Sequence, residues 1–165
     1  MFGKSLSEYV AFQKPILILI AAVWALRLVL SMAGVPVSGA QFVSVTGVLV
    51  LGALYYGWAV GQKGFGSFKQ LYGLNLIQGL FSQTLVALAI VLAIVIGQDN
   101  IYTIPEFYPP SQGNDPMGLP PDGKNFGHAI EHIVVAGAIG FPIIGWLLGS
   151  LVLLATRKFA RSASA

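Results

Sequence analysis

Four apolar stretches, each long enough to cross a lipid bilayer as a helix, constrain this chain more than any other feature. A membrane-spanning helix needs about 20 mostly apolar residues. Because backbone groups in lipid must be hydrogen-bonded within their own segment, each stretch is predicted to be helical. The expected spans are residues 15–35, 42–61, 71–97 and 127–155, each with approximate ends.

Composition supports a membrane environment. Only 9% of the residues are charged, whereas soluble domains carry roughly 25%. So few charges could not cover the surface of a water-soluble fold. We therefore predict an all-α integral membrane protein, a single four-transmembrane-helix bundle over residues 1–165, with a long outer loop at residues 98–126. The chain has no cysteine, which excludes disulfides, thiolate metal sites and cysteine nucleophiles.

The distribution of basic residues predicts the orientation of the bundle. Cytoplasmic loops carry an excess of Lys and Arg. Apart from Lys124 in the outer loop, the basic residues outside the spans all fall on one side of the membrane. This predicts that both termini are cytoplasmic, and a bacterial inner membrane is expected. The basic residues on that side are Lys4, Lys14, Lys63, Lys69, Arg157, Lys158 and Arg161. This pattern is typical of membrane orientation, and no nucleic-acid partner is expected.

The segment before the first span starts with Ser5-Leu-Ser-Glu8, which matches a capping box. It predicts a helix that either lies in the headgroup region as a short interfacial helix or simply extends the first span.

The outer loop is rich in Pro, Gly, Asn and Asp and carries the acids Asp99, Glu106, Asp115 and Asp122 against Lys124. Loops of this length are uncommon and often functional. It is expected to be either a lid over the bundle or an arm that docks a partner.

Two glycine motifs predict close helix packing. Gly57/Gly61 in the second span and Gly145/Gly149 in the fourth are each G-x-x-x-G, which lets helix backbones approach closely in lipid. The two spans share the longer pattern G-x-x-x-x-G-W-x-x-G around these glycines. Either a duplicated hairpin or independent convergence on small-residue packing would explain the shared pattern. The glycines are expected to join the two spans within one subunit, or to join subunits.

His128 and His132 are the only histidines, and they flank Glu131 near the start of the fourth span. Four residues apart on a helix, the two imidazoles share one face. The spelling H-x-x-E-H matches the inverted zinc-peptidase motif, in which two histidines bind zinc and the glutamate is the general base. Nothing else in the chain matches that class, so only the chemistry of the motif is used below.

This chemistry predicts a site for zinc or another divalent metal at the outer face, formed by His128, Glu131 and His132. Catalytic zinc usually takes three protein ligands and a water, so the third ligand would be Glu131 or an acid of the outer loop. In an enzyme, Glu131 would instead be the base. The alternative needs no metal, because the histidines could face headgroups while Glu131 interacts with the helix dipole.

Arg27 lies inside the first span, toward its outer side. A charge at that depth costs at least about 2.5 kcal/mol and usually faces the bundle interior with a partner. Glu131 is the acid nearest in depth, so an Arg27–Glu131 ion pair is expected, which would either compete with metal binding or orient the carboxylate. The alternative is that Arg27 extends to the outer interface.

The third span carries a polar stripe. Asn75, Gln78 and Ser82 share a helix face, and Gln83 follows them. Interhelical hydrogen bonding is the ordinary explanation for such residues, and a site for a substrate or quinone headgroup is the alternative.

Taken together, these features favour a non-catalytic membrane subunit or assembly protein that associates with a copy of itself or with another membrane protein. It would sit in the lipid bilayer and bind a divalent metal outside. One alternative is a membrane metalloenzyme, a hydrolase using His128, Glu131 and His132 at the outer leaflet. Another is an oligomeric transporter or channel component lined by Arg27 and the polar stripe.

Overall fold

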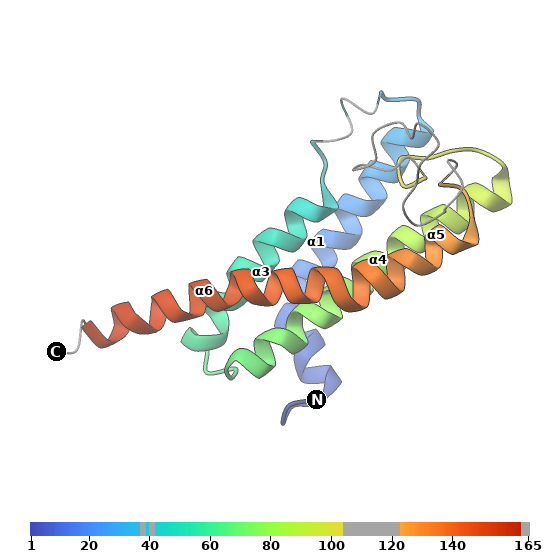
Figure 1. The fold of residues 1–165 in the computed structure, drawn as a ribbon. Helices are drawn as coiled ribbons and strands as arrows, with labels where there is room; N and C mark the ends of the chain where they lie inside the picture. The colour runs from blue at the N-terminus through green and yellow to red at the C-terminus, as the bar shows by residue number, and fades with distance from the viewer. Residues whose placement is uncertain (37–38, 40–41, 104–122, 163–165) are drawn as a thin grey trace, which may run out of the picture.

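Four long helical rods lie side by side in an elongated bundle (Figure 1). The computed structural model describes residues 1–36, 39, 42–103 and 123–162. Every regular element in this part of the chain is a helix, and four of the helical rods are long and apolar enough to cross a membrane. The predicted all-helical chain with four helices of membrane-spanning length is therefore confirmed.

The first rod, α1, runs without interruption from Leu6 to Met32. It begins at the predicted capping box. The Ser5 side chain accepts a hydrogen bond from the Glu8 N–H, and the Glu8 carboxylate accepts one from the Ser5 N–H. Pro15 lies inside the helix rather than at its start. The residues before Pro15 therefore extend the first span, and the alternative of a separate interfacial helix is wrong.

The second and third rods, α3 (Val45–Gln62) and α4 (Phe68–Ile96), are joined by a short turn. The Ser44 hydroxyl caps α3 by accepting a hydrogen bond from the Gly47 N–H, at 3.1 Å. Gly97 ends α4 in the left-handed conformation with a φ of 70°, which glycine adopts without steric penalty. These boundaries lie within three residues of the predicted ones.

The fourth rod combines α5 (Phe126–Glu131), the π-helix η1 (His132–Gly140) and α6 (Phe141–Ser162). The N–H of Phe141 donates to the carbonyl of Ala136, five residues back, as in a π-helix. Pro142 has no N–H to donate to the carbonyl of Ala138, so a helix of this sequence is expected to kink there. The structure places the irregularity before Pro142, in a π-helical segment that starts at His132.

Small residues bring α3 and α6 into backbone contact within one chain. A Cβ atom on Gly57 would collide with the carbonyl group of Gly149. A Cβ atom on Gly61 would lie 3.0 Å from a leucine side chain of α6, and one on Gly145 would collide with the side chain of Asn75 on α4. These four glycines therefore lie at helix contacts inside the subunit, the first of the two arrangements expected for them.

The two ends of the bundle carry different connections. The N-terminus and the α3–α4 turn lie at one end, and α6 extends beyond it (Figure 1). We name this the termini end. The connections from α1 to α3 and from α4 to α5 approach the opposite end, named here the long-loop end. That the termini end faces the cytoplasm stays a prediction from the basic residues.

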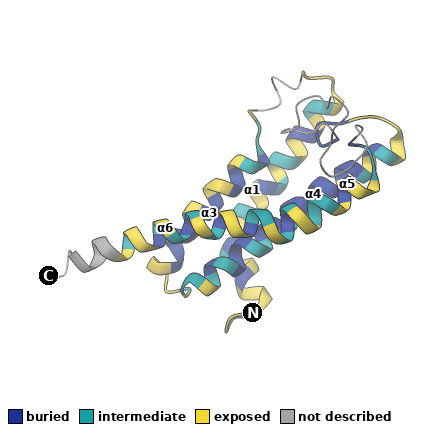
Figure 2. Ribbon diagram, in the orientation of Figure 1, coloured by how far each residue is buried: buried dark blue, intermediate teal, exposed yellow. Residues whose placement is uncertain are grey.

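Exposed residues lie along the outward faces of the rods (Figure 2), and many of them are large hydrophobic residues. Large hydrophobic side chains such as Leu51, Val95 and Leu151 are more than 60% exposed. Contiguous apolar surface on this scale is rare on soluble monomers. It is the surface expected of helices surrounded by lipid, while polar side chains of the same rods point into the bundle.

Candidate functional site

His128 and His132 meet at the long-loop end, at the start of the fourth rod. The Asn125 side chain caps α5 by accepting a hydrogen bond from the His128 N–H, at 2.8 Å. The four-residue spacing then places both imidazoles on one face of the helix. Their Nε2 atoms lie 3.1 Å apart, and their ring centroids 4.7 Å apart. The structure thus brings these two predicted site residues together.

The Nδ1 atom of each imidazole, on the side away from the other ring, contacts an oxygen atom. The Nδ1 atom of His128 lies 2.7 Å from the carbonyl oxygen of Gly123. The Nδ1 atom of His132 lies 2.7 Å from Oε1 of Gln83. Because both partners are oxygens that only accept hydrogen bonds, each Nδ1 carries a proton. In the neutral tautomer that is protonated on Nδ1, each ring would present an unprotonated Nε2 to the other ring, 3.1 Å away.

Gln83 reaches His132 because α4 and η1 approach each other closely. A Cβ atom on Gly79 would lie 2.7 Å from the carbonyl oxygen of Gly137, and one on Gly137 would lie 3.0 Å from Cβ of Gln83. The buried Gln83 amide also donates through Nε2 to Oγ of Ser82, at 3.3 Å. This second bond points the amide NH₂ group away from the imidazole and leaves Oε1 facing it.

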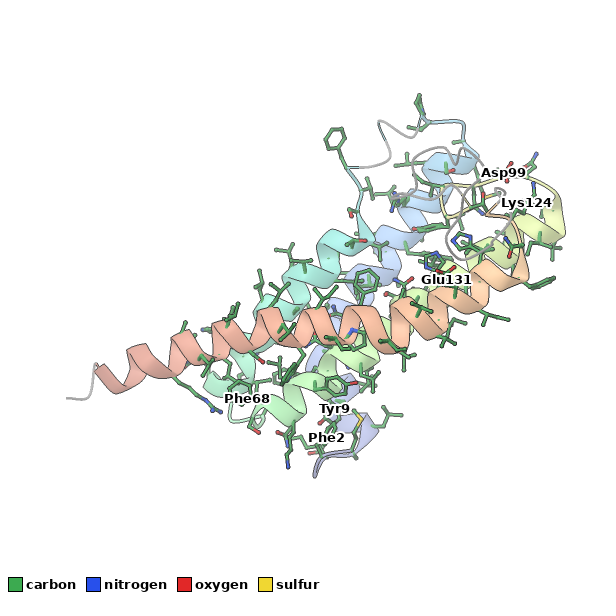
Figure 3. All side chains as sticks on the ribbon, viewed as in Figure 1. Phe2, Tyr9, Phe68, Asp99, Lys124 and Glu131 are labelled. Atoms are coloured by element: carbon green, nitrogen blue, oxygen red, sulfur yellow. The ribbon has the colours of Figure 1, made fainter. Side chains whose placement is uncertain are left out.

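Gly123 is fixed beside His128 by the turn that follows α4. A Cβ atom on Gly123 would collide with the backbone carbonyl of Thr103. Next to it, Nζ of Lys124 forms an ion pair with Asp99 at 3.2 Å, and Figure 3 shows the two side chains close together. The first and last parts of the outer loop therefore meet at the histidine pair. The lid and docking-arm alternatives concern residues 104–122, which lie outside the described residues.

Glu131 does not join the histidine pair. Within residues 1–36, 39, 42–103 and 123–162, no three side chains of His, Asp or Glu are grouped so that they could hold a metal ion. Among the described residues, Glu131 is therefore not grouped with His128 and His132 as a third ligand. The remaining acids considered as ligands lie outside the described residues, namely Glu106, Asp115 and Asp122.

Arg27 points into the bundle but does not pair with Glu131. Its side chain is buried, and its guanidinium carbon lies 5.5 Å from the centroid of the Tyr102 ring. Ion pairs between described residues join Lys4 to Glu8 and Lys124 to Asp99, and the expected Arg27–Glu131 pair is not among them. The interior placement agrees with the cost of exposing a charge to lipid.

Tyr102 anchors the outer turn to the first rod. Its hydroxyl donates to the backbone carbonyl of Trp24, at 3.1 Å. Burial raises the pKa of this hydroxyl above its ordinary value. Tyr102 therefore keeps its proton at neutral pH and stays a donor, which ties the turn holding Gly123 to α1.

The polar stripe of α4 bonds to the protein itself. Gln78 donates to the carbonyl of Leu49 on α3, at 2.9 Å. Asn75 and Ser82 donate to carbonyls of their own helix, at 2.9 and 3.1 Å. One member of the stripe thus makes the interhelical bond that was expected, and two satisfy their hydroxyl or amide within α4.

Gln83 and Gly123 are the site residues that the sequence analysis missed. Gln83 was noted only as a neighbour of the stripe, although it is a polar side chain at the depth of the histidines in an antiparallel span. That match in depth is the signal that could have found it. Gly123 acts through its backbone carbonyl. Every residue has such a carbonyl, so the amino-acid sequence does not mark the one that contacts the imidazole.

Comparison of the chain with protein-family models, with curated proteins and with solved structures finds no match.

Proposed function

We propose that this chain is a non-catalytic membrane protein that binds a transition-metal ion between His128 and His132 at its long-loop end. The observation that carries the proposal is the 3.1 Å separation of two Nε2 atoms whose rings each place Nδ1 2.7 Å from a carbonyl oxygen. Two lone pairs that face each other at this distance repel. A cation held by both of them removes the repulsion.

The distance between the two Nε2 atoms suits a shared metal ion. Metal–imidazole bonds are about 2.0–2.1 Å long, so two of them across this gap enclose an angle of about 100°. That angle is close to tetrahedral geometry. Metal-bound histidines almost always donate their other ring N–H to a carbonyl or carboxylate, which is the role of Gly123 and Gln83 here. Neutral imidazoles suit zinc, copper and nickel.

Two protein ligands leave coordination positions for water or for a group supplied by another molecule. Because no described carboxylate faces the pair, we favour binding or delivery of the ion over hydrolysis. Association with a partner remains part of the proposal, but it would use a face other than the four glycines, since these lie at contacts inside the subunit.

A metal-free arrangement competes directly with this proposal. If the Gln83 amide were turned over, its NH₂ group would donate to Nδ1 of His132. His132 would then carry its proton on Nε2 and donate it to Nε2 of His128. The present orientation is favoured by the bond from Gln83 to Ser82, and the two arrangements differ in whether they bind metal.

A metal titration separates them. Purified protein in detergent is treated with a chelator and titrated with Co²⁺, whose visible absorption reports tetrahedral nitrogen ligation, and Zn²⁺ is then added as a competitor. We expect one equivalent of Co²⁺ to bind and Zn²⁺ to displace it. His128→Ala and His132→Ala should each abolish the signal.

Glu131→Gln is the matched control, because it alters the residue between the histidines without touching their contacts. It should bind Co²⁺ like the unaltered protein. Absence of binding, or binding that persists in both histidine variants, would overturn the proposal. Loss of binding in Glu131→Gln would show that Glu131 is a ligand and would favour the hydrolase alternative instead.

A further inference from the structure

The termini end gathers basic side chains on an apolar framework. The described basic residues there are Lys4, Lys14, Lys63, Lys69 and Arg157, and the described acid among them is Glu8. Glu8 forms an ion pair with Lys4 at 3.2 Å. Figure 3 shows Phe2, Tyr9 and Phe68 gathered at the same end. This end therefore combines a net positive charge with aromatic side chains, of which Phe2 is 42% exposed and Tyr9 is buried.

A glycine-bracketed turn builds the centre of this surface. Gly64 and Gly66 have φ angles of 62° and 155°, which side-chain-bearing residues rarely adopt. They let Phe65 fold back onto α1. Its ring lies 5.4 Å from the centroid of Tyr9 and 4.0 Å from that of Phe12. The turn between α3 and α4 is thus packed on the first helix through aromatic rings.

Two ammonium groups lie on these rings. Nζ of Lys4 lies 4.7 Å from the centroid of Phe65, and Nζ of Lys63 lies 5.8 Å from that of Phe12. Lys63 also donates to the Tyr55 hydroxyl at 2.9 Å. Each ammonium group has three N–H donors. Lys4 uses one of its N–H groups for Glu8, and Lys63 uses one for Tyr55. Both ammonium groups can therefore donate further hydrogen bonds to an anion.

We propose that Lys4, Phe12, Lys63 and Phe65, the basic–aromatic cluster, bind the headgroup of an anionic phospholipid. Lysine ammonium groups attract anionic headgroups, and aromatic rings favour the membrane interface. The inference goes beyond the proposed metal binding and does not depend on it.

The basic–aromatic cluster adjoins an exposed apolar face of α1, and this favours a lipid over an acidic protein segment as its ligand. Leu6 and Val10, which follow Lys4 on α1, are 66% and 40% exposed. An anionic lipid would satisfy both features at once, with its phosphate on the ammonium groups and its acyl chains along the outward face of α1. An acidic peptide would satisfy only the charges.

Native mass spectrometry of the full chain in detergent tests this. Phosphatidylglycerol and phosphatidylcholine of equal chain length are added in competition, and poly-glutamate is added in a separate run. We expect phosphatidylglycerol to bind in preference. The double variant Lys4→Gln/Lys63→Gln should lose about 30-fold in phosphatidylglycerol affinity, the loss expected for two basic residues near an anionic surface.

Lys14→Gln/Lys69→Gln is the matched control, since it removes the same charge from the same end outside the basic–aromatic cluster. Its phosphatidylglycerol affinity should fall by clearly less than that of Lys4→Gln/Lys63→Gln, because in this proposal only the lysines of the basic–aromatic cluster contact the headgroup. Equal binding of the two lipids, equal losses in both double variants, or binding of poly-glutamate without phosphatidylglycerol would each overturn the inference. The last result would assign the surface to an acidic protein segment.

Discussion

The long-loop end and the termini end of this bundle use their polar side chains in opposite ways. At the long-loop end, two imidazoles are fixed by directional bonds from Nδ1 to carbonyl oxygens and face each other at 3.1 Å. At the termini end, ammonium groups lie over aromatic rings at 4.7 to 5.8 Å. Directional bonds fix atoms, whereas a charge over a ring tolerates many orientations.

This difference indicates what each end can recognise. A small cation needs lone pairs that converge within a few tenths of an ångström, and the long-loop end has them. A headgroup at a membrane surface needs charge and an amphipathic border without fixed geometry. Under the two proposals, the same bundle would separate a site for one ion from a surface for lipid.

Breaking the backbone contact between α3 and α6 should give the largest effect on the stability of the bundle. Gly57→Ala places a Cβ atom against the carbonyl of Gly149. Overpacking of this kind costs about 1–3 kcal/mol or more. We expect unfolding in mixed detergent to show a loss near the upper end of that range.

Gly47→Ala, on the same helix, controls for the change in helix propensity. A Cβ atom there would lie at an ordinary 3.6 Å from Ser44, so the substitution should be neutral or stabilise by up to about 1 kcal/mol. If both alanine variants were equally stable, the close approach of α3 and α6 would be refuted.

Replacing the residue that orients His132 should give the next largest effect, and only at the long-loop end. Gln83→Met keeps the volume but removes the carbonyl oxygen that accepts from Nδ1. Loss of such a partner typically lowers metal affinity 10- to 100-fold. The Co²⁺ titration should show a loss in this range, with lipid preference unchanged.

Gln83→Glu should restore the affinity, since a carboxylate accepts the same hydrogen bond more strongly. A merely structural role for Gln83 would not give this rescue. Equal metal affinities for Gln83→Met and the unaltered protein would show that the amide does not orient the imidazole.

The smallest effect is expected from the exposed ion pair beside Gly123. Asp99→Asn removes one partner of Lys124, and the Asp99 side chain is 62% exposed. Exposed pairs contribute about 0.2–1 kcal/mol. Stability should fall by no more than that, and Co²⁺ affinity should change by less than about threefold, because Gly123 is also held by Thr103. A larger loss of affinity would show that this ion pair positions the site.

Local patterns in the sequence account for much of the fold. Hydropathy located the four long helices, and the Ser5–Glu8 capping box marked the true start of α1. The π-helix from His132 to Gly140 was not predicted, and this segment packs against α4 at Gly79 and Gly137. Hydropathy along one helix carries no information about such a contact.

The candidate site was predictable only in part, because contacts between different segments cannot be read from the sequence of one helix. The spacing of His128 and His132 predicts a shared face, which requires only helix geometry. The bond from His132 to Gln83 joins residues 49 positions apart, and the bond from His128 to Gly123 uses a backbone carbonyl. Glu131 shares the motif with the histidines, but the fold does not bring it to their Nε2 atoms.

The most direct test of the central claim is nitrogen NMR of histidine-labelled protein, recorded without metal and after addition of one equivalent of Zn²⁺. Without metal, both rings should carry their proton on Nδ1. With Zn²⁺, the Nε2 resonances of both rings should shift together while both Nδ1 atoms stay protonated. A proton found on Nε2 of His132 in the metal-free protein, with no change on adding Zn²⁺, would contradict the account.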